Sequence, residues 1–283
     1  AMGGQNMCDI DLALRRLVHI IHDGLLEQGK HDWMHFLGTS KLEWAVLLTT
    51  IQRAVRKYHN PNFTISFDCA SPFLATANGQ VYTNTTTVDA TKWSYRMEPG
   101  IDDKKYATDT RSYRDACLQD GIFQNFTDSP ITNGLAVKDV CIYKPGDLNK
   151  VGKEGNTSWD SFSYALLMAH NVFQHIDAVQ TANREFDNGS VPLMLIHKGV
   201  GKHYFQETVD KIFAAKTREQ ALAIIDDNHD YWMQIIGTRG ATGKKQLNTN
   251  AVINEFWDFA PIPDTEPEDL DESKLDSLEQ SVL

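Results

Sequence analysis

The segment from Trp33 to Asp68, "WMHFLGTSKLEWAVLLTTIQRAVRKYHNPNFTISFD", carries the main evidence for the fold. Its two ends, "WMHF" and "FTISFD", are short runs of strand-forming residues. Between them Leu48, Ile51 and Val55 belong to a row of apolar residues at helical spacing. A strand, a helix and a strand joined by short loops predict a parallel α/β sheet or barrel.

The flanking segments extend this pattern with more helices and one irregular region. "MCDIDLALRRLVHIIHDGLLEQG" predicts a helix that stops at Gly29. A longer helix is expected from about Trp159 to Asp187, and helical structure again at about 203–236. We therefore expect three parts, namely residues 1–190 with a loop-rich insertion at about 83–157, a mainly helical extension at 191–262, and a tail at 263–283.

The composition is that of a globular chain, with 41% hydrophobic and 10% aromatic residues. No apolar run approaches the roughly 20 residues of a membrane span, and the first residues do not form a signal peptide, so no membrane association is expected. The four cysteines show no tight pairing, which favours a reduced, cytoplasmic setting.

The net charge of −11 lies mostly in the tail. Residues Asp264 to Leu283 hold eight acidic residues and one lysine, so we expect a solvated tail or one that docks a partner. The nearly neutral remainder neither indicates nor excludes a local basic groove for nucleic acid.

Asp68 follows the second strand directly, and a cysteine and a Ser-Pro pair come next. In parallel α/β folds the reactive residues lie at the carboxyl ends of strands. The aspartate is therefore interpreted either as a local cap of a turn or helix, or as a nucleophile or metal ligand. Cys69 is interpreted as a small buried residue, because nothing near it in sequence would lower its thiol pKa.

Four short motifs in order resemble the tRNA-guanine transglycosylase superfamily. "FDCASPFLATANGQVY" is similar to the segment with the nucleophilic aspartate, and "AMGGQ" to the Gly-Gly loop beneath the bound base. "MHFLGTS" resembles the next strand and its glycine loop, and "LLMAHNVFQHIDAVQTANREF" the late helix that begins at a His-Asn pair. The resemblance implies the C-terminal part of a TIM (β/α)8 barrel.

The resemblance also implies an activity and a set of site residues. Asp68 would attack C1′ of a guanosine in a polynucleotide, expel guanine, and hold the sugar as an ester until a 7-deazaguanine base replaces it. No cofactor would be required. The residues that would bind the substrate are Gly3, Gly4, Gly38, Asn78 and Gly79.

The chain departs from the family pattern in its zinc site. The family's closely spaced cysteine cluster is absent, and only Cys117 and Cys141 precede His170, which matches the family's histidine. Tetrahedral zinc needs a fourth ligand. We therefore interpret His170 as a hydrogen-bonded core histidine, with a structural zinc at Cys117, Cys141 and His170 as the alternative.

A second departure concerns which nucleic acid, tRNA or DNA, the chain would modify. The loop after the nucleophile carries arginine in the tRNA enzymes, whereas Leu74, Ala75 and Thr76 stand here. This favours the DNA-modifying branch of phages and bacteria over tRNA, in the cytoplasm of a bacterial or phage-infected cell. The candidate cations for nucleic-acid binding are Lys104, Lys105, Arg111, Arg114, Arg239, Lys244 and Lys245, and Phe73 or Tyr82 could stack on an extruded base. Trp33, Trp44 and Trp159 are expected in the core. His31 and His35 could be ligands at the ends of a strand, and we interpret them as structural residues.

A third departure leaves two functions open. The Gly-Gly loop lies at Gly3 and Gly4, and the family's earlier strands with its general-base aspartate have no counterpart here. The chain is thus interpreted as a fragment, as a subunit whose barrel a second chain completes, or as a different fold. The function is expected to be guanine exchange in nucleic acid, or that of a non-catalytic accessory subunit.

Overall fold

The computed structural model describes residues 1–2, 9–86, 93–101, 104–140 and 161–235. Its α-helices and strands are, in chain order, α1 (Ile10–His22), β1 (Trp33–Phe36), α2 (Leu42–Tyr58), β2 (Thr64–Phe67), α3 (Ser71–Ala77), β3 (Gln80–Thr86), β4 (Ser94–Pro99), α4 (Tyr113–Gln119), α5 (Val137–Val140), α6 (Ser161–Asp187), α7 (Tyr204–Ala214), α8 (Arg218–Asp227) and α9 (His229–Gln234). Short 3₁₀ turns lie at Lys104–Thr108, Thr132–Gly134 and Leu193–Leu195.

The predicted strand–helix–strand unit is present as β1, α2 and β2. The two strands run parallel, with Trp33 opposite Thr64 and Phe36 opposite Phe67. On the other side of β1, Met2 forms a parallel bridge, since its N–H donates to the His35 carbonyl at 2.6 Å. The mixed α/β class is therefore confirmed. The described strands form two separate two-stranded sheets and do not close a barrel.

The first hydrophobic core lies between this parallel pair and the helices. Alternation along the strands turns Met34, Phe36, Ile65 and Phe67 toward it. Helices α1, α2, α7, α8 and α9 supply most of the remaining core, in which Trp44 is buried as predicted. The helices after residue 203 thus share a core with α1 and α2.

The region that we predicted to be an irregular insertion contains regular structure and a second core. Strands β3 and β4 form an antiparallel hairpin, with Val81 opposite Glu98, and α4 and α5 follow it. Val81, Tyr113, Cys117 and Phe123 are buried in a separate apolar cluster. The sequence did not indicate these elements, because they are short and their sequences are rich in threonine, asparagine and charged residues.

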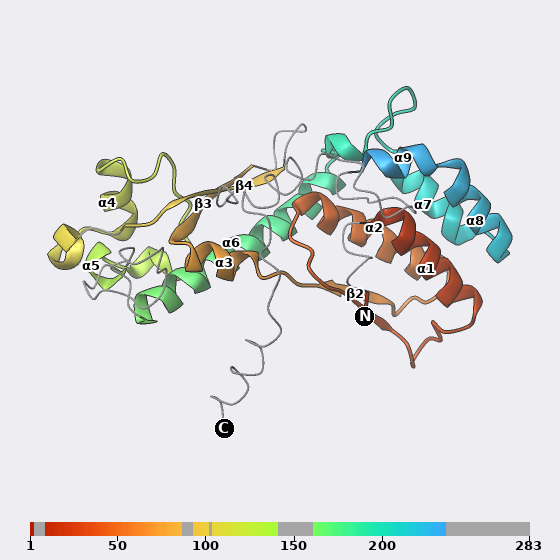
Figure 1. Ribbon diagram of the computed structural model, residues 1–283, viewed down its shortest axis with the longest axis horizontal. Coiled ribbons are helices and arrows are strands. Elements are labelled where there is room, and N and C mark those ends of the chain that lie inside the picture. Colours follow the sequence, from red (N-terminus) through yellow and green to blue (C-terminus); the bar gives the residue numbers. More distant parts are fainter. Residues whose placement is uncertain (3–8, 87–92, 102–103, 141–160, 236–283) are drawn as a thin grey trace, which may run out of the picture.

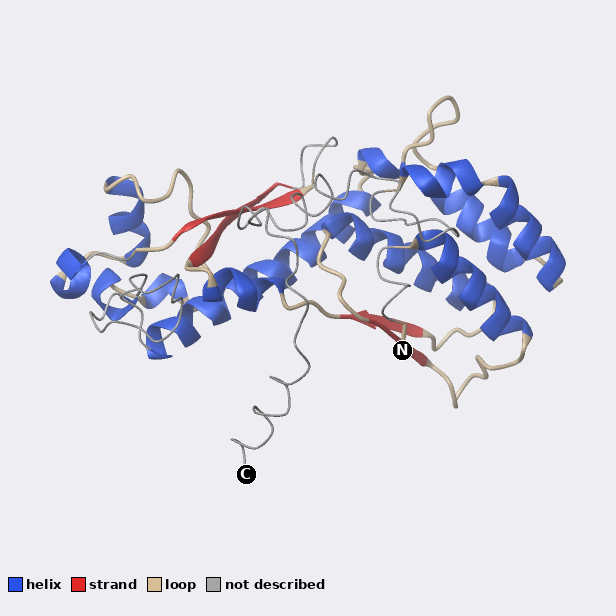
Figure 2. Ribbon diagram, in the orientation of Figure 1, coloured by secondary structure: helices blue, strands red, loops and turns tan. Residues whose placement is uncertain are grey.

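Helix α6 joins the two halves of the elongated molecule (Figure 1). Leu167, near its start, belongs to the second core, whereas Ala178 and Ala182 belong to the first. Its 27 residues span about 40 Å, enough to reach along both cores. Figure 2 shows the two strand pairs at separate places with α6 running between them.

Candidate active site

Asp68 lies at the carboxyl end of β2, beside the loop that leaves β1. Its backbone continues the parallel pairing, because its N–H points to the Phe36 carbonyl at 3.4 Å and its carbonyl accepts from the Thr39 N–H at 2.7 Å. Its side chain is 60% exposed. The sequence prediction of a carboxylate at a strand end is confirmed.

The carboxylate is held by the neighbouring loop. Oδ1 of Asp68 accepts the Gly38 N–H at 3.1 Å. Gly38 has a φ of 75°, a left-handed conformation that glycine adopts at little cost. Ala70, and not Asp68, is the N-cap residue of α3, and no side chain caps that helix. The interpretation of Asp68 as a helix cap is therefore not supported, and its oriented carboxylate is open to a ligand.

A histidine lies on the other side of the carboxylate. Nε2 of His35 is 3.6 Å from Oδ2 of Asp68, and Nδ1 of His35 is 2.8 Å from Oγ of Ser66. Trp33 donates its indole N–H to the same Ser66 oxygen at 2.7 Å. These side chains alternate along β1 and β2, on the sheet face opposite the first core.

Trp33 and His35 differ from the sequence expectation. Trp33 is 66% exposed and does not pack in the core, because its position on β1 points away from the helices. His35, taken alone in the sequence, is interpreted as a structural residue. The period-two alternation in "WMHF" and "TISFD" would have placed both residues on one face with Ser66 and Asp68, and this signal was missed.

The structure separates the other described substrate-binding candidates from Asp68. Asn78 is the C-cap residue of α3, and Gly79, with a φ of 73°, turns the chain into β3. The seven residues of α3 span about 10 Å between this turn and the Asp68 end of the helix. Of the substrate-binding candidates that the structure describes, Gly38 is the one that contacts the carboxylate, and Gly3 and Gly4 lie outside the described residues.

The segment after Asp68 is helix α3, where a loop was expected. Pro72 lies in its first turn, where a missing N–H costs nothing. Ala75 and Thr76 are buried, so this side of the segment cannot read a polynucleotide. Phe73 is 45% exposed and open to a ligand, whereas Tyr82 is buried and cannot stack on an extruded base.

The described cationic candidates are mostly engaged with acidic or aromatic neighbours. Arg111 pairs with Asp109 at 2.6 Å and with Asp120 at 2.9 Å, and the guanidinium lowers the pKa of both carboxyls. Arg114 pairs with Asp128 at 3.2 Å.

Of the remaining candidates, the structure describes the side chain of Lys105. The Lys105 ammonium lies 4.8 Å from the centre of the Tyr106 ring. The side chain of Lys104, and all of Arg239, Lys244 and Lys245, lie outside the described residues. The candidate cations whose side chains are described, Lys105, Arg111 and Arg114, therefore have their partners away from Asp68.

His170 is a core histidine, as its interpretation from sequence proposed. It is fully buried, and its two ring nitrogens lie 2.8 Å from Ser129 Oγ and 2.8 Å from the Tyr82 carbonyl. Burial lowers its pKa to about 4 and raises the pKa of the Cys117 thiol to about 12. Because both ring nitrogens of His170 are engaged in these hydrogen bonds, the histidine has no free nitrogen to offer a zinc ion.

The rest of the chain, as far as the structure describes it, offers no other metal site. No group of three or more histidine, cysteine or acidic side chains there could hold a metal ion. Cys141, the remaining member of the alternative zinc set, lies outside the described residues.

Cys69 has a partner that the sequence did not indicate. Its Sγ lies 3.4 Å from Nε2 of His175, whose ring stacks on Tyr95 with centroids 5.1 Å apart. Burial raises the pKa of the thiol and lowers the pKa of His175 to about 4. Both groups are neutral near pH 7, so the pair does not supply a thiolate.

No protein-family model, curated protein or solved structure matches this chain. Among the described helices, none is both long enough and apolar enough to cross a membrane. Function is therefore inferred from the geometry around Asp68 and from the sequence motifs.

Proposed function

We propose that this chain is a nucleic-acid guanine transglycosylase, acting on DNA in preference to tRNA, with Asp68 as its nucleophile. One observation carries the proposal: an exposed carboxylate stands at the carboxyl end of a parallel strand, with one oxygen held by the Gly38 amide. In such folds this is the usual position of reactive groups. The four sequence motifs that resemble the transglycosylase superfamily suggest the type of reaction, base exchange at a sugar carbon.

The proposed reaction consists of two displacements at one sugar carbon. An oxygen of Asp68 attacks C1′, the bond from C1′ to the guanine nitrogen breaks, and the base leaves with the bonding electrons and takes up a proton from water. The incoming 7-deazaguanine then attacks C1′, loses its ring proton to water, and releases the carboxylate. Two inversions retain the configuration of the sugar. The exposure of Asp68 supports this role, because a polymer must reach it.

The test is exchange of labelled guanine into duplex DNA and into tRNA. The unaltered chain is compared with Asp68→Asn and with Asp177→Asn, which removes an exposed carboxylate on α6. Loss of exchange by Asp68→Asn alone would support the nucleophile, and the labelled polymer would identify the substrate. Equal exchange by all three proteins would exclude Asp68.

A second candidate is a non-catalytic accessory subunit that binds nucleic acid or a catalytic chain. It is favoured by the observation that the described strands do not close a barrel. A second chain would then complete the sheet and carry the catalytic groups. The accessory function predicts that the chain exchanges no guanine alone, and that exchange in the presence of the partner chain survives Asp68→Asn. Loss of that exchange in Asp68→Asn would instead make Asp68 the nucleophile of a shared site.

A further inference from the structure

The open face of β1 and β2 carries a row of polar contacts that ends at Asp68. We propose that Trp33, Ser66 and His35 form a relay that fixes the imidazole with its Nε2–H toward Asp68, which makes His35 a positioning residue for that carboxylate. The role in exchange rests on the proposed function. The relay itself is a property of the fold and can be measured separately.

The direction of the relay follows from what each group can donate. The indole nitrogen of Trp33 is only a donor, so at 2.7 Å it must donate to Ser66 Oγ. Among the described residues, Nδ1 of His35 at 2.8 Å is the acceptor within reach of the Ser66 hydroxyl proton. A nitrogen that accepts this proton carries none, and the proton of the neutral ring then lies on Nε2.

The contact at Asp68 favours the same tautomer. Nε2 of His35 is 3.6 Å from Oδ2 of Asp68, which is too long for a strong hydrogen bond but close enough for electrostatic attraction. A bare nitrogen lone pair facing the carboxylate would be repelled, whereas an N–H is attracted. Protonation of the ring leaves an N–H in the same place, so the contact survives in both charge states.

The relay explains two features that packing does not. Trp33 is 66% exposed, and its indole is held by the bond to Ser66 and by its contact with the His35 ring, whose centroid is 5.9 Å away. Asp68, itself exposed, has Gly38 at one oxygen and His35 at the other. Contacts at both oxygens fix the plane of the carboxylate, which a nucleophile needs in order to approach C1′ in line.

The first test measures the tautomer of His35 by nitrogen NMR of the full chain labelled at histidine. We expect Nε2–H in the unaltered protein and in Asp68→Asn, because Ser66 and Trp33 set the tautomer. Ser66→Ala removes the donor to Nδ1 and should lower the population of the Nε2–H tautomer, which the contact with Asp68 alone then favours. An Nδ1–H tautomer in the unaltered protein would overturn the relay. A spectrum of Ser66→Ala identical to that of the unaltered protein would overturn it too.

The second test uses exchange kinetics with a matched pair of variants. His35→Phe removes the donor, and kcat should fall about 100-fold with little change in KM, as expected for a misplaced reacting group. His35→Gln keeps an N–H donor and should recover most of the rate. Equal loss in both variants would overturn the positioning role. If the unaltered chain exchanges no guanine, the proposed function fails, and the tautomer spectra still decide the relay.

Discussion

At the scale of single residues, the buried histidines have a measurable consequence. His170 and His175 have a pKa lowered from 6.5 to about 4, with burial as the main cause. The folded protein keeps them neutral, whereas the unfolded chain binds protons below about pH 6.5. The unfolded state therefore binds more protons as the pH falls, and stability must decrease.

We expect the free energy of unfolding to fall from about pH 6.5 to about pH 4, by up to about 3 kcal/mol for each histidine. Denaturant unfolding at several pH values measures this. Arg111 lowers the pKa values of Asp109 and Asp120. These two carboxylates therefore lose their contribution to the free energy of unfolding at more acidic pH, from about pH 4 downward. The two groups of residues therefore act in different pH windows.

The control compares His170→Gln with a change at the exposed His31. His170→Gln should be less stable at pH 7 but should lose less further stability on acidification. His31→Gln should keep the full pH dependence. A profile in which both variants lose stability in parallel with the unaltered protein would show that His170 does not cause the acid effect.

Sequence reasoning found Asp68 but not its surroundings. A carboxylate at a strand end is visible in the chain, because strand formers precede it. The contacts of His35 and Ser66 depend on the register between β1 and β2, which brings His35 opposite Ser66. Register is set by packing over the whole unit, and 31 residues separate the two side chains in sequence.

At the scale of elements, Asn171 ties α6 to the segment that follows Asp68. Its side-chain oxygen accepts the Tyr82 N–H at 2.8 Å, and its nitrogen donates to Thr76 Oγ1 at 2.9 Å and to the Gln80 carbonyl at 3.1 Å. The residue is fully buried. One amide thus connects α6 with both α3 and β3.

Asn171→Ala should destabilise the protein by about 3 to 5 kcal/mol, because it leaves several buried polar groups unpaired. Thermal and denaturant unfolding measure the loss. Asn183→Ala is the matched control on the same helix, since among the described residues the Asn183 side chain bonds the Val179 carbonyl one turn earlier and no other group. A similar small effect of both changes would contradict the proposed connection.

The long helices and the strands β1 and β2 could be predicted from sequence, whereas the short elements that follow Asp68 could not. Helices α1, α2 and α6 show apolar residues at helical spacing, and the alternating strand β2 was also visible. Helix α3 has only seven residues and includes a proline, and β3 is polar over much of its length. Their stability comes from contacts with α6, which lies far along the chain.

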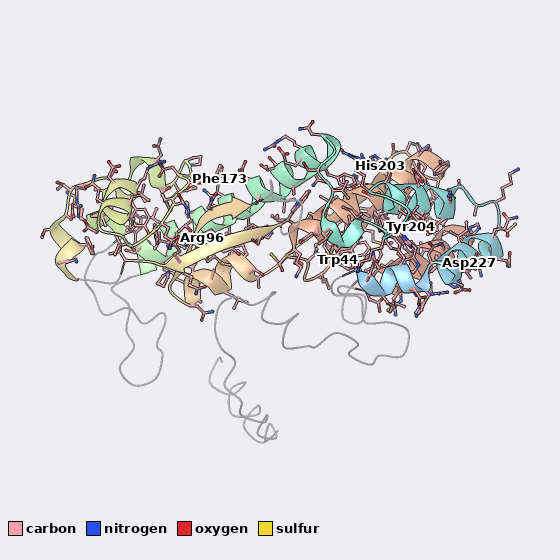
Figure 3. All side chains as sticks on the ribbon, turned by 90° about the horizontal axis from the view of Figure 1, so that it is seen from above. Trp44, Arg96, Phe173, His203, Tyr204 and Asp227 are labelled. Atoms are coloured by element: carbon pink, nitrogen blue, oxygen red, sulfur yellow. The ribbon has the colours of Figure 1, made fainter. Side chains whose placement is uncertain are left out.

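At the scale of the whole molecule, two hydrophobic cores share one long helix. Trp44 lies in one half of the molecule, while Arg96 on β4 and Phe173 on α6 lie in the other (Figure 3). Ile212 is buried in the first core and Leu167 in the second. Residues of each cluster pack against their own cluster, so the two halves can differ in local stability.

We therefore expect Leu167→Ala and Ile212→Ala to act on different halves. Each removes a buried branched side chain and should cost about 2 to 5 kcal/mol. Native-state hydrogen exchange should speed up in β3, α4 and α5 for Leu167→Ala, and in α1, α2 and α7 for Ile212→Ala. The two variants serve as controls for each other, because both shorten a buried aliphatic residue. Faster exchange throughout both halves in either variant would mean that α6 couples the cores into one cooperative unit, and Asp68 would then depend on the second core as much as on the first.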